Sequence, residues 1–317
     1  MTKSIYDLGA SMYVPATKEP ADLAEIGNGI KFPALRSVIF CTEDAVTDAE
    51  VHTALKHLSK ALPLMNKAER PMRFVRVRNP YVMGKVLSMT GIEKIDGFVL
   101  PKLTRGSLRD YLSNLRKGHP FWLMPTLETL EVFDREEMTK LRRNLCEDER
   151  TRENILCLRI GGNDLLRCLG IRRDCSRTIY DTPLGVLIPQ LVMEFSPHGF
   201  GLTGPVFESF DPAHYSVLRD EVERDLQCGL FGKTAIHPTQ IAVIEDAWKV
   251  SEVEYEEATR IVAPDAPAVF KCSRMQMCEP TTHAPWAQKI LQRAQVYGIR
   301  GEETVSHPRF AVIGGGR

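Results

Sequence analysis

Short apolar runs alternate with amphipathic stretches of helical length, and this alternation constrains the fold more than any other feature. Apolar residues recur at three- and four-residue steps over 48–62 and 107–115, which predicts helices. The stretch 183–195 is apolar almost all round and predicts a buried helix. Eight runs have the length of strands: 11–15, 37–41, 72–77, 97–100, 121–125, 155–160, 199–203 and 229–236. We therefore predict an α/β fold with a parallel sheet, closed as a (β/α)8 TIM barrel.

Beyond Ile236 the pattern changes to helices alone. They are predicted over 237–250, 251–262 and 286–297, with a proline-containing stretch over 263–280. The 317 residues, 43% of them hydrophobic, suffice for one barrel and an appendage. We predict a catalytic barrel over 1–250, a C-terminal helical extension or lid over 251–300, and a flexible tail over 301–317.

Charge and cysteine content exclude several classes of partner. Lys plus Arg and Asp plus Glu both total 41, so no basic surface for nucleic acid or acidic membranes is expected. The eight cysteines form no CxxC pair and are expected to be reduced thiols. The N-terminus has no apolar segment of signal-peptide length, and no run of 18 apolar residues occurs. We expect a cytoplasmic protein.

Charged residues follow two of the early strands, at the end of the barrel where active sites form. Glu43 and Asp44 come just after 37–41, where a helix N-cap at Asp44 beside a solvated Glu43 is the alternative to a catalytic role. Alternation should point Arg76 and Arg78 to one side, where two cations would suit a carboxylate or thioester oxygen. An arginine pair on a solvated edge is the alternative.

Later strands are followed by one lysine and two carboxylates. Lys102 is a candidate substrate contact or an ordinary surface residue. Glu128 follows 121–125, and Asp164 follows a glycine pair and Asn163; each is a candidate metal ligand or an acid at a helix start. Two carboxylates are the sparse ligand set that Mg²⁺ takes when water and substrate supply the rest. No GxGxxG motif supports a dinucleotide.

The motifs resemble the HpcH/HpaI aldolase and citrate lyase β-subunit-like superfamily of carbon–carbon bond lyases. Residues 229–241, GLFGKTAIHPTQI, resemble the GFxGKxxIHPxQI stretch of that family. The other matches fall in the family's order and span about 11–298: 13–15 (LFVPG), 40–46 (FDLEDAV), 76–77 (VRVN), 100–102 (LPK), 127–129 (IET), 161–164 (GxxD) and 277–280 (MVDxP).

The resemblance implies a role for each matched residue. Glu128 and Asp164 would ligate Mg²⁺ together with oxygens of a small carboxylate or acyl-CoA substrate. Arg76 would stabilise the enolate oxygen, and Glu43 and Asp44 would organise water and that arginine. Apart from the resemblance, we also expect substrate contacts from Arg78 and Asn163, in addition to Lys102 and Glu279. Glu279 would act on a neighbouring subunit, because many relatives are trimers, so a homo-oligomer is expected.

Three departures from the family pattern bear on the substrate. Cys41, Arg78 and Glu279 stand where the family has Asp, Asn and Asp, which makes the pocket more cationic. Such departures resemble a divergent branch found in bacterial stress-response, tellurite-resistance-type biosynthetic clusters. Arginines are frequent in 151–177 and suit a phosphorylated or carboxylated substrate, although a solvated helix face accounts for most: Arg152, Arg159, Arg167, Arg172, Arg173 and Arg177.

A Mg²⁺-dependent lyase or aldolase is the predicted function. Cleavage of a carbon–carbon bond next to a carbonyl leaves charge on an oxygen, which a divalent cation and an arginine stabilise. Two alternatives stay open: a thioester hydrolase or acyl transferase that uses the same metal site, and a non-catalytic member that binds a metabolite or joins a complex.

Overall fold

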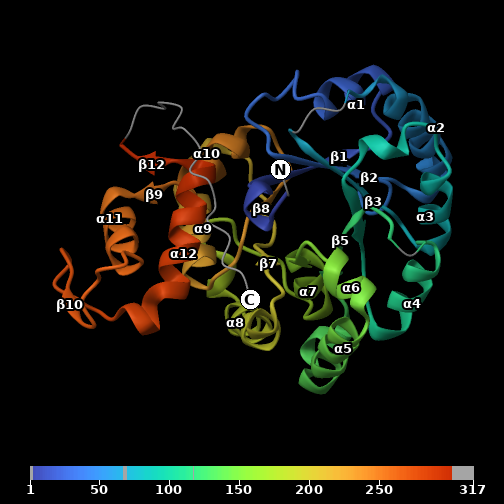
Figure 1. Cartoon of the computed structure of the whole chain (residues 1–317). Helices are drawn as coiled ribbons and strands as arrows, with labels where there is room; N and C mark the ends of the chain where they lie inside the picture. Colours follow the sequence, from blue (N-terminus) through green and yellow to red (C-terminus); the bar gives the residue numbers. More distant parts are fainter. Residues whose placement is uncertain (1–2, 67–69, 117, 302–317) are drawn as a thin grey trace. The chain divides into compact units, whose positions relative to one another are not determined.

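The computed structural model describes residues 3–66, 70–116 and 118–301 (Figure 1). They belong to two compact units, Met1–Trp248 and Lys249–Arg317. The predicted tail, 301–317, lies outside the described residues apart from Gly301. Among the described residues, no helix combines the length and the apolar character needed to cross a membrane. All eight cysteines are free thiols.

The first unit contains eight parallel strands in the order β7-β6-β5-β4-β3-β2-β1-β8. A parallel bridge between Gly204 and Lys233 joins the two end strands and closes the barrel. The strands are β1 (Ala10–Pro15), β2 (Ser37–Cys41), β3 (Met72–Arg76), β4 (Gly97–Leu100), β5 (Trp122–Leu127), β6 (Leu158–Ile160), β7 (Leu202–Thr203) and β8 (Lys233–Ala235). The predicted TIM barrel is confirmed.

Amphipathic helices follow the strands and cover the barrel; α2 and α3 lie on its outer side (Figure 1). The helices are α1 (Pro20–Gly27), α2 (Val51–Ala61), α3 (Pro80–Leu87), α4 (Arg105–Ser113), α5 (Arg135–Glu147), α6 (Glu149–Asn154), α7 (Gly162–Cys168), α8 (Leu184–Phe195), α9 (Tyr215–Gln227) and α10 (Thr239–Ala247). The helix predicted over 183–195 is α8, but it is buried on one face only, because Val186 and Met193 are exposed.

A cluster of buried charges joins β8 to α9 in this unit. Lys233 Nζ lies 3.0 Å from Glu221 Oε1 and 2.7 Å from Asp225 Oδ2, and all three side chains are inaccessible to solvent. Arg173 forms a second ion pair with Glu221, so two cations balance two carboxylates. The Tyr180 hydroxyl also donates to Asp225, over 2.7 Å. Lys233 is therefore a structural residue.

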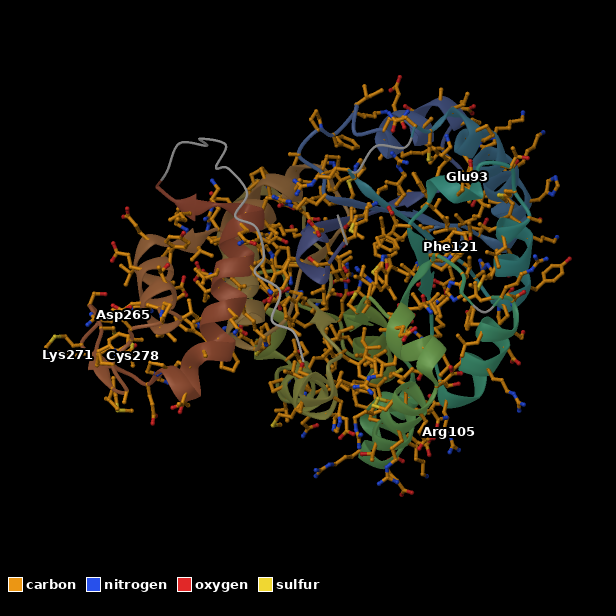
Figure 2. The ribbon with its side chains drawn as sticks, in the orientation of Figure 1. Glu93, Arg105, Phe121, Asp265, Lys271 and Cys278 are labelled. Carbon is orange, nitrogen blue, oxygen red and sulfur yellow. The ribbon has the colours of Figure 1, made fainter. Side chains whose placement is uncertain are left out.

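The second unit has its own apolar core, built from α11 (Glu252–Ile261) and α12 (Pro280–Tyr297). The prediction of helices alone was wrong for this unit. Short strands β9 (Val250–Ser251) and β12 (Ile299–Arg300) pair in parallel, and β10 (Phe270–Lys271) and β11 (Met277–Cys278) form a hairpin. Figure 2 labels Lys271 and Cys278 on that hairpin. Its Phe270 and Cys278 are buried in the core, which explains why the proline-containing stretch is ordered without a helix.

Candidate active site

A cavity of about 310 Å³ opens where the barrel strands end. It brings together residues that lie up to 223 positions apart in the sequence and that include five of the predicted site residues. Its lining comprises Tyr13, Asp44, Ala45, Arg76, Thr126, Glu128, Arg159, Ile160, Gly161, Gly162, Asn163, Asp164, Val206, Thr234 and Ile236. The predicted residues among them are Asp44, Arg76, Glu128, Asn163 and Asp164.

Glu128 is the buried carboxylate of this cavity, with 3% of its surface exposed. It follows β5, and its Oε1 accepts a 2.7 Å hydrogen bond from the backbone N–H of Lys102. Burial raises the pKa of Glu128 to about 7, and the negative charges of Asp164 and Glu43 add to this rise against the opposing effects of Lys102 and Arg76. A nearby cation would therefore favour the ionised carboxylate.

Lys102 adopts a left-handed backbone conformation that a non-glycine residue rarely takes, with φ of 49°. This turn follows β4 and places the backbone N–H on Glu128. The ammonium group contacts Glu43 and lies 3.0 Å from Asp44 Oδ1. Burial opposes its charge, but the two carboxylates outweigh that effect and raise the pKa of Lys102. Lys102 thus links the carboxylates after β2 to the one after β5.

Arg76, at the end of β3, is held by acceptors from β2 and the residues after it. Its Nη2 lies 3.0 Å from Glu43 Oε2 and 3.2 Å from Asp44 Oδ2. It also donates to Cys41 Sγ, from Nε over 3.3 Å and from Nη2 over 3.2 Å. The guanidinium lies 4.8 Å from the Tyr13 ring centroid. These contacts fix the orientation of a buried cation at the cavity wall.

Asp164 lies in the first turn of α7 and has an exposed partner. Its Oδ1 accepts a 2.9 Å hydrogen bond from Arg167, whose side chain is 69% exposed. Solvent screens that pair, so the arginine holds Asp164 only weakly. The carboxylate therefore remains available to a ligand in the cavity.

Gly161 supplies the space that Glu128 occupies. A Cβ at this position would collide with Cβ and Oε2 of Glu128 and lie 3.0 Å from its Cδ. We expect Gly161→Ala to displace the Glu128 carboxylate and to lower the free energy of unfolding by about 1–3 kcal/mol. The control is Gly106→Ala, whose Cβ would meet only Thr104 Oγ1 at 3.8 Å. Chemical denaturation of both variants tests this, and equal stabilities would contradict it.

The sequence model of one family, C–C bond lyases of the TIM-barrel fold, matches residues 2–299. The chain belongs to this family. The sequence is also similar to the (3S)-malyl-CoA thioesterase of Cereibacter sphaeroides, with 27% identity over 266 residues that cover 83% of this chain and 85% of the relative.

Solved structures show the same fold at low sequence identity. The protein CitE from Mycobacterium tuberculosis, in complex with magnesium, acetoacetate and coenzyme A, has a TM-score of 0.67 and 19% identity over 90% of this chain and 97% of that chain. A citrate lyase from Burkholderia xenovorans has a TM-score of 0.70 and 16% identity over 92% of both chains. These structures thus share the fold of 90% or more of this chain.

Four predicted site residues of this C–C bond lyase family member lie outside the cavity lining. Glu43 and Lys102 contact residues that line it, as described above. Arg78 instead donates to the Val46 carbonyl over 2.8 Å and lies 3.0 Å from Asp48. Glu279 precedes α12 in the second unit. The substrate-binding roles of Arg78 and Glu279 stay predictions.

Tyr13 and Arg159 are two of the ten lining residues that were not among the predicted site residues. Tyr13 comes from β1, and Arg159 comes from β6, where a charged residue stands between Leu158 and Ile160. A charge within a buried apolar strand is the signal that could have singled out Arg159, because burial of an unpaired charge is costly. Its placement inside the barrel is the new information that the structure gives.

Proposed function

We propose that this chain is a Mg²⁺-dependent carbon–carbon bond lyase or aldolase that acts on a carboxylated substrate, with acyl-CoA thioesters among the candidates. The observation that carries the proposal is the buried Glu128 carboxylate, which shares one cavity with Asp164 and Arg76. Two ligands for a cation and a fixed guanidinium beside them match the needs of an enolate-forming reaction. The family match supports the class of reaction.

The donor set fits magnesium. Glu128 and Asp164 follow consecutive strands and supply only carboxylate oxygens. Within the described ranges, no group of three or more His, Cys, Asp or Glu side chains is placed to hold a metal. Two carboxylates suit Mg²⁺, which keeps several waters and takes substrate oxygens as further ligands, whereas zinc prefers His and Cys. When bound, the ion would supply Lewis-acid stabilisation of charge on the substrate oxygen.

Arg76 and the residues that hold it would stabilise the charge that develops on the substrate. When the carbon–carbon bond breaks, its electron pair would form an enolate, and an N–H of Arg76 would donate to the enolate oxygen. The hydroxyl of the other fragment would lose its proton to water as that fragment becomes a carbonyl compound. Glu43, Asp44 and Cys41 hold the guanidinium in place, so little reorganisation is needed at that moment. Lys102 is a positioning residue, because its backbone N–H orients Glu128.

Thioester hydrolysis is a second candidate, favoured by the similarity to the (3S)-malyl-CoA thioesterase of Cereibacter sphaeroides. Incubation with (3S)-malyl-CoA, citryl-CoA and the free acids in Mg²⁺ buffer, followed by mass spectrometry, separates the two. A lyase converts malyl-CoA into acetyl-CoA and glyoxylate, whereas a hydrolase consumes water and releases malate and free CoA. We expect carbon–carbon cleavage of at least one compound; free CoA alone would replace the proposal with hydrolysis.

We further propose a homo-oligomer, with a trimer favoured, in which Glu279 reaches a neighbouring active site. Light scattering coupled to size-exclusion chromatography measures the subunit number. A monomer that retains full activity would rule out this shared site.

Metal affinity is expected to depend on pH through Glu128. Its pKa is raised to about 7, so the carboxyl is protonated below that pH and must lose its proton before it can bind a cation. Affinity for Mn²⁺, used as a magnetic probe for the Mg²⁺ site, should fall by up to ~10-fold per pH unit below 7 and level off above 8. Titrations from pH 5 to 9 followed by electron paramagnetic resonance test this. A constant affinity over that range would contradict it.

A further inference from the structure

Arg159 is a buried cation that the proposed chemistry leaves unused. Its side chain comes from β6, is 2% exposed and lines the cavity. Nη2 donates to Thr234 Oγ1 over 2.6 Å, whereas Nη1 is buried without a hydrogen-bond partner among the described residues. Burial of a guanidinium without a carboxylate is costly unless a ligand supplies the missing charge.

Other polar groups on the same level of the barrel lack partners too. Thr126 on β5 and Thr203 on β7 are the register neighbours of Arg159, so their side chains point to the same face of the sheet. Neither hydroxyl has a hydrogen-bond partner among the described residues. Three adjacent strands therefore present one cation and two hydroxyls with unmet hydrogen-bonding capacity. Of these side chains, Arg159 and Thr126 line the cavity.

The charge balance of the cavity distinguishes Arg159 from Arg76. Both guanidinium groups lie near the Tyr13 ring, at 4.8 Å for Arg76 and 5.6 Å for Arg159. Arg76 and Lys102 together balance the charges of Glu43 and Asp44. A divalent cation would balance Glu128 and Asp164. Arg159 is then the cation of the cavity that still requires an anion.

A second buried arginine shows what a purely structural guanidinium looks like in this barrel. Arg73 on β3 is also 2% exposed, but it donates to the carbonyls of Gly27, Asn66 and Lys94 and to the Asn66 side chain. Backbone carbonyls thus satisfy Arg73 from within the fold. Arg159 has a single threonine in their place.

We propose that Arg159 binds a second carboxylate of the substrate, which makes the site selective for dicarboxylates over monocarboxylates. This inference rests on the proposed function, because it assumes that the first carboxylate binds at Glu128 and Asp164 with the metal. Nη1 would donate to one oxygen of the second carboxylate, and the Thr126 hydroxyl would donate to the same group. A charge-assisted hydrogen bond in a buried site is strong enough to determine selectivity.

The test compares two ligands that differ at one group. (S)-malate and (S)-2-hydroxybutyrate share a 2-hydroxycarboxylate, and malate carries a carboxylate where the other has a methyl group. Isothermal titration calorimetry in saturating Mg²⁺ measures both on the full chain. We expect the wild type to bind malate ~10- to 100-fold more tightly, and Arg159→Met to lose this preference while its affinity for 2-hydroxybutyrate changes little.

Two further variants separate binding from folding. Arg159→Lys keeps the charge but not the fork geometry, so an intermediate preference for malate is expected. Arg73→Met removes an equally buried arginine and should lower thermal stability while the malate preference stays at the wild-type value. If Arg159→Met retains that preference, or if the wild type shows none, the inference is overturned.

Mn²⁺ binding in the absence of an organic acid distinguishes an error in this inference from an error in the proposed function. The wild type and Arg159→Met should bind Mn²⁺ equally. A wild type that binds no Mn²⁺ overturns the proposed function itself. A wild type that binds Mn²⁺ but neither organic acid overturns only the assignment of Arg159.

Discussion

Replacement of Glu128 by glutamine is expected to abolish Mg²⁺ binding at the cavity and to lower lyase activity on the order of 10³-fold. The substitution keeps the shape of the side chain and an oxygen that can accept from the Lys102 backbone N–H. It removes one of the two negative charges that would hold the cation. Removal of a residue that hydrogen-bonds to a metal ligand typically lowers the affinity for the metal by ~10- to 100-fold. Removal of the charge of the ligand itself should lower that affinity at least as much.

The same substitution should stabilise the metal-free protein at alkaline pH. The folded state raises the pKa of Glu128 to about 7, so it binds the proton more tightly than the unfolded chain does. The contribution of this group to stability is therefore present at low pH and is lost as pH rises through 7. Glutamine does not ionise and so carries no such penalty. The free energy of unfolding of the variant should therefore exceed that of the wild type by about 3 kcal/mol at pH 8, with little difference near pH 4.5.

Three measurements check this pair of effects: Mn²⁺ titration, activity on the substrate identified above, and urea denaturation in chelator at several pH values. The control is Glu93→Gln, the same chemical change at an exposed position that Figure 2 labels. It should match the wild type in all three. A Glu128→Gln variant that binds Mn²⁺ with wild-type affinity would exclude Glu128 as a metal ligand.

The eight strands were accessible from the sequence because a buried parallel strand leaves a plain signal. Continuous apolar runs bounded by turn residues mark β2 and β4 at their observed bounds, Ser37–Cys41 and Gly97–Leu100. The later strands are only two or three residues long, and their predicted runs, such as 229–236 for β8, were too long. Apolar residues that flank a short strand pack in the core as well, so hydrophobicity alone does not locate its ends.

The positions of the two candidate metal-binding carboxylates could be predicted from the sequence, whereas those of the cations could be predicted only in part. Strand order places Glu128 and Asp164 together, because consecutive strands of a barrel are neighbours. Alternation predicted a common side for Arg76 and Arg78, but β3 ends at Arg76, and Arg78 contacts Val46 and Asp48. The strand period no longer applies beyond the end of a strand. The left-handed turn at Lys102 has no sequence signal either, because no glycine marks it.

Residues 229–241, which carry the longest match to the family, show that a motif does not by itself reveal the role of its residues. A long motif match suggests catalysis, yet Lys233 lies in the buried charge cluster with Glu221 and Asp225. Gln240, from the same segment, donates to the carbonyls of Phe207 and Ser209. Lys233 links β8 to α9, and Gln240 links α10 to the segment 207–209 after β7. The segment thus builds part of the barrel end that carries the site, where Thr234 and Ile236 line the cavity.

Replacement of Lys233 by methionine is therefore expected to destabilise the protein by about 3–5 kcal/mol. The variant leaves two buried carboxylates facing one cation, Arg173, because Glu221 and Asp225 stay in place. Burial already raises the pKa of Asp225 to about 6 against the opposing effect of Lys233. Without the lysine this pKa rises further, so Asp225 binds a proton over a wider pH range.

The sign of the pH effect distinguishes this mechanism from a simple loss of packing. A carboxyl with a raised pKa costs stability only where it is ionised, so the loss caused by Lys233→Met should be larger at pH 8 than at pH 5. Adding Asp225→Asn restores the balance of charge and should recover part of the loss at pH 8. Denaturation of the single and double variants measures both effects.

The matched control is Lys31→Met, which breaks an ion pair with Asp22 in which both side chains are about 40% exposed. Solvent compensates both charges there, so no measurable change in stability is expected. If Lys233→Met matched this control, or if its loss were the same at pH 5 and pH 8, the buried cluster would not be the source of stability. Activities of variants in the segment around β8 could then be compared directly with the wild type. If the expected loss of stability is found, each of those activities must first be corrected for the fraction of unfolded protein.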